Sequence, residues 1–287
     1  MGLETSVIES LRLHGSGLYL LRREGVVGRT VEATDENRGR ASKALRVTAW
    51  LYEQGFPTVQ PVGVRLTEVE DTLVTFWRYL PQPETAAPSP VRAKALGELL
   101  PELHSLPAPP FELPTVEPLA RLHAAMQLDG GRIEPVLSDA DQRLLEERMA
   151  QAEQAYQALE FPLGHGLIHN DAHLGNLLAD PQSRYGYALT DWEGAGWGPR
   201  EIDLIQEGAP GNRFRESESL RETFAAVYGY DVASWPGWPV LRELRDLHSL
   251  AAYIRTASAK PAGLHELAVR LSSLRSGDRT RRWTAVS

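Results

Sequence analysis

The chain has 287 residues, 42% of them hydrophobic, and a formal net charge of −8. This length and composition provide for one large core or two lobes and exclude a disordered protein, while the acidic balance disfavours nonspecific nucleic-acid binding and mildly favours a cationic substrate. The absence of cysteine excludes disulfide scaffolds, thiolate metal sites and cysteine nucleophiles.

The first eighty residues contain β-rich runs around one helical pattern. Residues 17–21 and 26–31 are short β-rich runs separated by a charged turn. Residues 38–53 place apolar side chains at helical spacing, and residues 59–64 and 72–79 indicate two further strands. This part of the chain is therefore predicted to form a small antiparallel sheet that carries one helix.

A proline-rich connection separates this sheet from a mostly helical remainder. Helical patterns occupy residues 91–106, 138–159, 201–207, 216–228, 239–257 and 263–275. We predict an α+β, bilobal fold with an N-terminal lobe over 1–80, a hinge over 81–90 and a C-terminal lobe over 91–287. A short β-hairpin at about 166–192 would interrupt the helices of the larger lobe.

No secretory signal or membrane span is predicted from the N-terminus or from the apolar runs. The N-terminus lacks a basic region followed by an apolar stretch, and no apolar run approaches the ~20 residues that cross a bilayer. We therefore expect a cytoplasmic protein with no membrane contact, and no protein partner is evident from the sequence.

Two apolar runs in the predicted hairpin end in polar side chains. Leu167-Ile168 precede Asp171 and Asn176, and Ala188-Leu189 precede Asp191, fifteen residues after Asn176. A kinase-type phosphoryl-transfer site needs an aspartate beside the attacking hydroxyl, and an asparagine and an aspartate to hold Mg²⁺ on the nucleotide phosphates. The order of these three residues predicts a small-molecule kinase.

Each of the three has a plain structural alternative. Asp171 is predicted to be the general base, but alone it could cap a strand end through an Asx-turn. Asn176 and Asp191 are the predicted metal ligands, and singly they could be turn or cap residues. His169 is predicted to be a packed residue that holds the loop, whereas His173 is a candidate contact to nucleotide or substrate.

Four acidic residues beyond the metal aspartate are further candidates. Asp203, near the start of a helical segment, is predicted to hydrogen-bond back to the catalytic loop as a support. Glu193 is a candidate substrate ligand. Glu243 and Asp246 are three residues apart on one helix face, where they would contact substrate or simply form a solvated surface.

The small lobe offers candidates for nucleotide binding. Arg29, on a middle strand, is predicted to reach the α- and β-phosphates, with a solvent-facing charge as the alternative. Trp77, Arg78 and Tyr79 lie at the lobe boundary, where backbone groups would pair with an adenine edge unless these aromatic side chains are core. Residues 15–17 form a Gly-Ser-Gly sequence that indicates a phosphate loop or a plain hairpin turn.

The chain resembles the aminoglycoside phosphotransferase and choline kinase superfamily, and is most similar to its actinobacterial aminoglycoside phosphotransferase branch. The motifs that carry the resemblance are His169-Asn170-Asp171 with Asn176, then Asp191, then Gly198-Pro199 with Asp203. The resemblance implies a protein-kinase-like fold and an O-phosphotransferase that requires Mg²⁺ and uses ATP or GTP. It also implies that Asp171 is the base, Asn176 and Asp191 are the metal ligands and Arg29 occupies the phosphate-binding position.

Two positions depart from the family pattern. Aminoglycoside-type members usually have glycine where this chain has Asn170, whereas choline and ethanolamine kinases commonly have asparagine. The family also usually places a glutamate on the small-lobe helix to pair with the phosphate-binding cation. Here Glu36 or Glu32 would have to substitute, or the pair is absent.

Three functions are compatible with these observations. The leading hypothesis is phosphorylation of an antibiotic of aminoglycoside, amino-sugar or nucleoside type, for resistance or biosynthesis. The alternative is a metabolic kinase for choline, ethanolamine, homoserine or a sugar, with Trp192 and Trp197 as conceivable members of an aromatic cage. The third hypothesis, motivated by the missing helix glutamate, is a nucleotide-binding regulator without catalysis.

Overall fold

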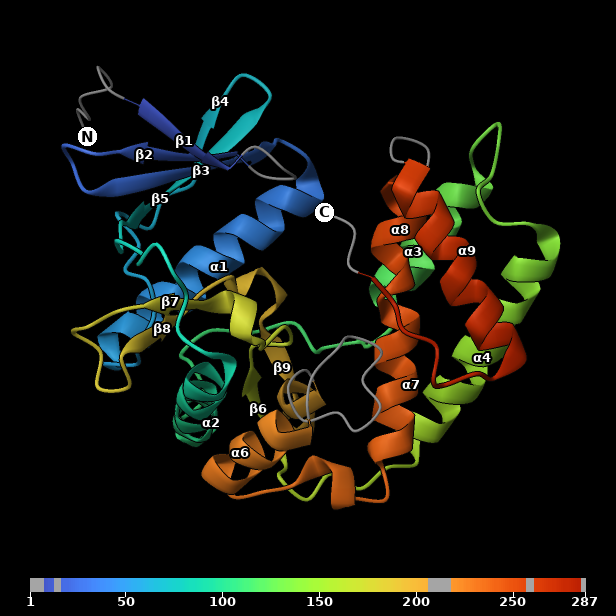
Figure 1. Cartoon of the computed structure of the whole chain (residues 1–287). Coiled ribbons are helices and arrows are strands. Elements are labelled where there is room, and N and C mark those ends of the chain that lie inside the picture. The colour runs from blue at the N-terminus through green and yellow to red at the C-terminus, as the bar shows by residue number, and fades with distance from the viewer. Residues whose placement is uncertain (1–7, 13–16, 206–217, 257–260, 285–287) are drawn as a thin grey trace.

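The computed structural model describes residues 8–12, 17–205, 218–256 and 261–284, so most of the predicted Gly-Ser-Gly loop lies outside the described residues. A β-rich N-terminal lobe lies beside a larger helical lobe (Figure 1). The predicted bilobal α+β fold is confirmed by this arrangement. No helix in the described ranges is long and apolar enough to cross a membrane.

The N-terminal sheet is antiparallel, and its strand order is β1-β2-β3-β5-β4. Its strands are β1 (Ile8–Arg12), β2 (Gly17–Leu21), β3 (Val26–Glu32), β4 (Thr67–Val69) and β5 (Thr72–Arg78). Strands β1 and β4 were not predicted from the sequence, and the strand predicted at residues 59–64 is wrong. That segment makes one isolated bridge, between Pro61 and Trp77, because Pro61 has no N–H to donate and Gly63 adopts a left-handed backbone.

Helix α1 (Asp35–Glu53) packs between the sheet and the larger lobe. It begins where the Thr34 hydroxyl caps the backbone N–H of Asn37 at 3.2 Å. Its buried positions Ala44, Val47 and Leu51 recur at helical spacing, which gives the helix one apolar face.

The larger lobe consists mainly of helices that pack in pairs: α2 on α6, α3 on α8, α4 on α7 and α8 on α9. Their bounds are α2 (Ser89–Ser105), α3 (Ala120–Gly130), α4 (Asp139–Gln157), α6 (Glu218–Tyr228), α7 (Trp238–His248), α8 (Leu250–Thr256) and α9 (Pro261–Ser276). The sequence analysis did not predict α3. The helix that it predicted over 239–257 is divided at Ser249 into α7 and α8.

Two small sheets present the functional loops. Strand β6 (His165–Ile168) pairs with β9 (Gly196–Pro199), and β7 (Leu177–Ala179) pairs with β8 (Tyr187–Leu189). The predicted hairpin is therefore β7–β8. The loop between β6 and β7, residues 169–176, is the predicted catalytic loop, and the segment after β8 is the predicted metal loop.

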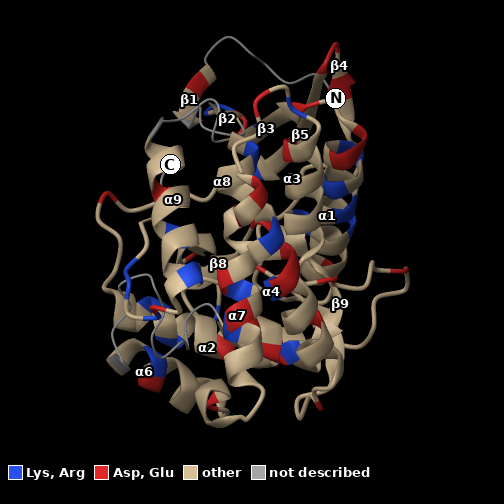
Figure 2. Ribbon diagram, turned by 90° about the vertical axis from the view of Figure 1, so that its right-hand side faces the viewer, with Lys and Arg blue, Asp and Glu red and all other residues tan. Residues whose placement is uncertain are grey.

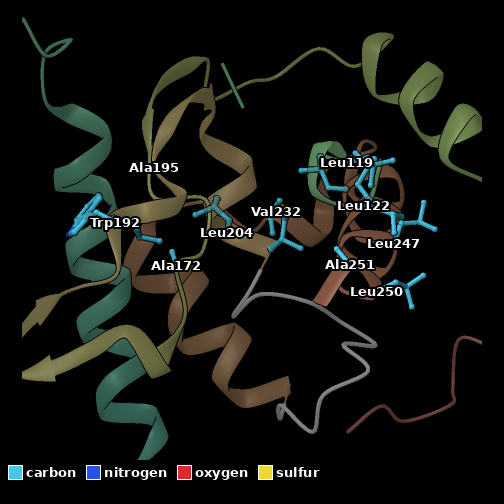
Figure 3. Packing of buried hydrophobic residues seen from close by; sticks show 14 of the residues in the cluster. Leu119, Leu122, Ala172, Trp192, Ala195, Leu204, Val232, Leu247, Leu250 and Ala251 are labelled. Atoms are coloured by element: carbon cyan, nitrogen blue, oxygen red, sulfur yellow. The ribbon is translucent and has the colours of Figure 1, made fainter. Parts of the chain in front are cut away.

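One hydrophobic cluster runs through both lobes. Figure 3 follows it from Trp192 through Leu204 and Val232 to Leu247. On the side of the small lobe, the ring of Trp192 meets Phe56 edge-on, with 5.9 Å between ring centroids. The metal loop is consequently anchored in the shared interior.

Candidate active site

The catalytic loop is held by one buried carboxylate. Asp203 accepts hydrogen bonds from the backbone N–H groups of His169, at 2.7 Å, and Asn170, at 2.6 Å. A ring nitrogen of His104 lies 3.1 Å from the same carboxylate, and its other ring nitrogen lies 2.8 Å from the Tyr228 hydroxyl. Because charge-assisted hydrogen bonds in a buried site are strong, this chain of contacts fixes the start of the loop.

His169 joins the catalytic loop to the metal loop. Its ring is fully buried, its Nε2 lies 2.8 Å from the carbonyl oxygen of Thr190, and the ring packs on Trp192 with 4.6 Å between centroids. A ring in this position cannot contact a bound substrate. Its contacts instead keep Asp171 and Asp191 on adjoining loops.

Two residues of these loops have a left-handed backbone. Asn170 has φ of 62° and Asp191 has φ of 72°. This region is costly for most side chains, but asparagine and aspartate tolerate it better than others. Both turns redirect the chain at the point where a functional side chain must leave a strand end.

Asp171 lies partly exposed among positive and imidazole groups. Its Oδ1 is 3.9 Å from Arg245 Nη1, and its Oδ2 is 3.8 Å from His173 Nε2. Burial alone would raise the pKa of Asp171, but Arg245 and then His173 outweigh it and hold the pKa below its ordinary value. The carboxylate is therefore ionised at neutral pH and can accept a proton from a hydroxyl.

Asn176, Asp191 and Glu193 line the same cavity and provide oxygen donors. The Asn176 amide nitrogen donates to the Asp171 carbonyl at 2.9 Å, which leaves its amide oxygen available. One oxygen of Glu193 is buried without a hydrogen-bond partner among the described residues. Carboxylate and amide oxygens suit Mg²⁺, which takes its remaining ligands from phosphates and water.

No group of three or more His, Cys, Asp or Glu within the described ranges could hold a metal ion by protein side chains alone. The oxygen atoms of Asn176 and Asp191 fit a Mg²⁺ ion bound together with nucleotide phosphates, since Mg²⁺ commonly has only one or two carboxylate ligands.

A cavity of about 320 Å³ lies between the lobes above these ligands. It falls within the size range of small-molecule sites. Its lining includes Arg29, Thr48, Trp77, Arg78, Tyr79, Leu80, Gln82, Asn176, Asp191 and Glu193.

The predicted adenine contacts are only partly available. The backbone N–H of Arg78 donates to Gln60 at 2.8 Å, and that of Tyr79 donates to Gly25 at 2.9 Å, so neither can donate to a purine. Leu80, which the sequence analysis did not single out, also lines the cavity. In the part of the chain that the structure describes, its N–H has no acceptor, which makes it the better candidate for an adenine edge.

The acidic partner of Arg29 comes from the metal loop. Arg29 on β3 makes a close ion pair with Glu193 and lies 3.4 Å from Asp191. The predicted alternatives are wrong, because Glu36 pairs with Arg255 at 3.2 Å and Glu32 is exposed at the end of β3.

The face of α1 beneath Arg29 is occupied by Ala41 and Ala44, which are too short to reach it. Glu193 was predicted to be a substrate ligand, but the structure places it against Arg29. The sequence signal was its spacing, two residues beyond Asp191.

The remaining candidates lie outside this cavity. Glu243 faces α4 and accepts a hydrogen bond from Arg148 on that helix at 2.9 Å. It also forms an ion pair at 3.2 Å with Arg279, which follows α9. Asp246 is half-buried on α7 and does not line this cavity. His173 stays beside Asp171, and its ring lies over Gly175, where a Cβ would approach it to 2.6 Å.

Comparison with known proteins assigns the family. Residues 12–244 match the model of the phosphotransferase enzyme family. The chain belongs to this family. It is thus a small-molecule phosphotransferase, and the predicted superfamily is confirmed. No curated protein matches the chain.

Solved structures share the fold of this phosphotransferase at low sequence identity. A spectinomycin phosphotransferase bound to ADP and spectinomycin has a TM-score of 0.62 and 13% identity, over 95% of this chain and 92% of its own. A choline/ethanolamine kinase family protein from Mesorhizobium loti has a TM-score of 0.63 and 18% identity, over 96% and 90%. A microcompartment-associated aminopropanol kinase has a TM-score of 0.68 and 14% identity, over 98% and 95%.

Proposed function

We propose that this phosphotransferase transfers the γ-phosphoryl group of ATP or GTP to a hydroxyl of a small molecule. The observation that carries the proposal is the convergence of Asp171, Asn176 and Asp191 on adjoining loops beside the cavity that Arg29 lines. The new bond joins the acceptor oxygen to phosphorus, the bond to the nucleoside diphosphate breaks, and the hydroxyl proton passes to Asp171.

The other groups position the nucleotide. Mg²⁺, held by Asn176 and Asp191, would neutralise charge on the phosphates. Arg29 would bind the α- and β-phosphates once nucleotide separates it from Glu193, and the backbone N–H of Leu80 would meet the base. Structures of similar proteins with ADP or GDP support a nucleotide donor.

The acceptor class divides into the two predicted possibilities. Spectinomycin and kanamycin phosphotransferases among the similar structures support an antibiotic acceptor, while the choline/ethanolamine and aminopropanol kinases support a metabolic one. A cage for a quaternary ammonium is disfavoured, because Trp192 is buried with its N–H bonded to Thr58 at 2.9 Å. The arginines near Asp171 also disfavour a polycationic aminoglycoside, so we favour a metabolic hydroxyl compound.

Turnover with Mg-ATP or Mg-GTP across acceptor panels tests the proposal. Asp171→Asn should lower kcat with an acceptor by at least ~10²-fold, because it removes the base. Asp71→Asn, on the exposed turn before β5, is the matched control and should retain full activity. Full turnover by Asp171→Asn would disprove the assigned base, whereas Mg-nucleotide binding without turnover would support the regulator hypothesis.

A further inference from the structure

Positively charged side chains from several helices lie on the acceptor side of Asp171. Arg245 on α7 approaches its carboxylate to 3.9 Å. Arg121 lies in the first turn of α3, and Arg40 and Lys43 on α1 are close enough to it for the charges to interact. Figure 2 shows several Lys and Arg positions along α1.

Hydrogen bonds and an ion pair join α7 to the segment before α3 and α1 to the C-terminal lobe. His248 Nδ1 on α7 lies 2.9 Å from the carbonyl oxygen of Pro118, just before α3. The basic stretch of α1 runs from Arg38 to Arg46. Just before it, Glu36 pairs with Arg255 of α8 at 3.2 Å, and at its end Arg46 donates a hydrogen bond to the Glu112 carbonyl at 3.3 Å. The segment of α1 between these two anchors therefore lies against the C-terminal lobe.

Lys43 and Arg40 are partly buried next to like charges. Burial, followed by the charges of Arg40 and Arg121, lowers the pKa of Lys43 to about 8. Burial and then Arg121 also lower the pKa of Arg40, although its Nη1 lies 3.7 Å from Glu36; its Nε has no hydrogen-bond partner among the described residues. Clustered, desolvated cations cost free energy unless an anion joins them.

A recess beside the catalytic loop shares Arg245 with this group of cations. Asn170, Arg245 and His248 provide its polar lining, and Ile202, Leu241 and Leu244 provide apolar walls. Walls of this kind exclude water and strengthen the attraction between a cation and an anionic ligand. The recess can accept a small charged group while the neighbouring hydroxyl faces Asp171.

On the basis of the proposed function, we propose that the acceptor is itself an anion. It is a hydroxyl compound whose carboxylate or phosphate group binds between Lys43, Arg121 and Arg245. The overall charge of −8 does not contradict this, because substrate charge is set by the local surroundings of the site. Such an acceptor neutralises the cations, whereas a cationic amino-sugar or choline would add to their repulsion.

Radiolabelled ATP and a metabolite extract provide the test. The extract is separated by ion exchange into anionic, neutral and cationic fractions, and each is incubated with the enzyme and Mg²⁺. The labelled product should arise from the anionic fraction. A product from the neutral or cationic fraction would overturn the proposal.

Charge-neutralising variants identify the binding groups. Lys43→Gln and Arg121→Gln should each raise the acceptor KM about tenfold and change kcat little, since each removes a charge-assisted contact. Lys94→Gln on α2 and Arg143→Gln on α4 remove the same charges from exposed positions and should have no effect. Equal effects of the test and control variants would also overturn the proposal.

Calorimetry separates failure of this proposal from failure of the proposed function. If the protein does not bind Mg-ADP, the kinase function itself is wrong. If no fraction yields a labelled product, the Mg-ADP complex is titrated with 3-phosphoglycerate and with glycerol. We expect 3-phosphoglycerate to bind saturably and glycerol not to bind, and we expect the binding of 3-phosphoglycerate to be weaker in Lys43→Gln and Arg121→Gln. If 3-phosphoglycerate does not bind, the anionic acceptor is wrong, but the proposed kinase function still stands.

Discussion

The backbone of Asn170 explains a departure from the family pattern. Its φ of 62° is a conformation that glycine adopts freely and that asparagine tolerates better than most residues. The exchange of glycine for asparagine at this position is therefore accounted for by the turn before Asp171. It carries no information on whether the acceptor is an aminoglycoside or a smaller metabolite.

We predict that Asn170→Gly keeps the stability of the protein, because glycine adopts this backbone conformation freely. Asn170→Val should be destabilised by about 1–3 kcal/mol and lose activity, because a β-branched residue is strained in this conformation. Urea unfolding and steady-state kinetics check both expectations. A stable, active Asn170→Val would show that the turn does not require a left-handed residue.

Arg245 lowers the pKa of Asp171 and so affects both stability and activity at acid pH. The interaction contributes stability above the unfolded pKa of Asp171, and this stability is lost as pH falls through the folded pKa. Activity falls in the same direction, because Asp171 must be ionised to accept a proton. In Arg245→Met the burial of Asp171 is less opposed, so its pKa should rise and the acidic limb of the kcat/KM profile should move to higher pH. Arg143→Met is the control, and an unmoved limb in Arg245→Met would contradict the assigned coupling.

At the scale of elements, α2 and α6 approach closely at Gly97. A Cβ at this position would lie 3.0 Å from Cβ of Val227 and 3.1 Å from the backbone oxygen of Phe224. Gly39, inside α1, has no such neighbour within 4 Å. The two helical glycines therefore differ in packing.

Alanine substitutions at these two glycines should have opposite effects. Gly97→Ala should lower the free energy of unfolding by about 1–3 kcal/mol through overpacking against a helix backbone. Gly39→Ala should raise it by about 0.5–1 kcal/mol through helix propensity. Denaturant unfolding measures both, and stabilisation by Gly97→Ala would mean that α6 moves aside at little cost.

The elements with clear periodicity could be predicted from the sequence. Helices α1, α2 and α4 were found within a few residues, because their apolar faces recur at helical spacing. Helix α3 was not found, although Pro118 precedes a run of good helix formers, Ala120 to Leu128. The strand predicted at 59–64 failed because proline and glycine prevented regular pairing.

The candidate site was predictable in its local motifs and not in its long-range pairs. Spacing along two short segments singled out Asp171, Asn176 and Asp191. The partnership of Arg29 with Glu193 joins residues far apart in sequence, and it depends on how β3 lies over the metal loop. The cations around Asp171 come from separate helices and were invisible for the same reason.

At the scale of the whole molecule, the shared core should make unfolding cooperative. Phe56→Ala removes a buried ring that packs on Trp192 and should cost about 3–5 kcal/mol. Tryptophan fluorescence and far-UV circular dichroism should report one coincident transition in both proteins. An early transition confined to the β-rich lobe would show that the two lobes unfold separately.

Because the hydrophobic core is continuous through Phe56 and Trp192, it also limits which fragments and lobe-swapped chimeras of this chain can fold. A fragment ending at residue 80 would leave the apolar face of α1 in water and should aggregate. Exchanging the first lobe with that of a relative would likewise mismatch α1 against a foreign metal loop. A working chimera would have to transplant α1, Phe56 and the segment around Trp192 as a single unit.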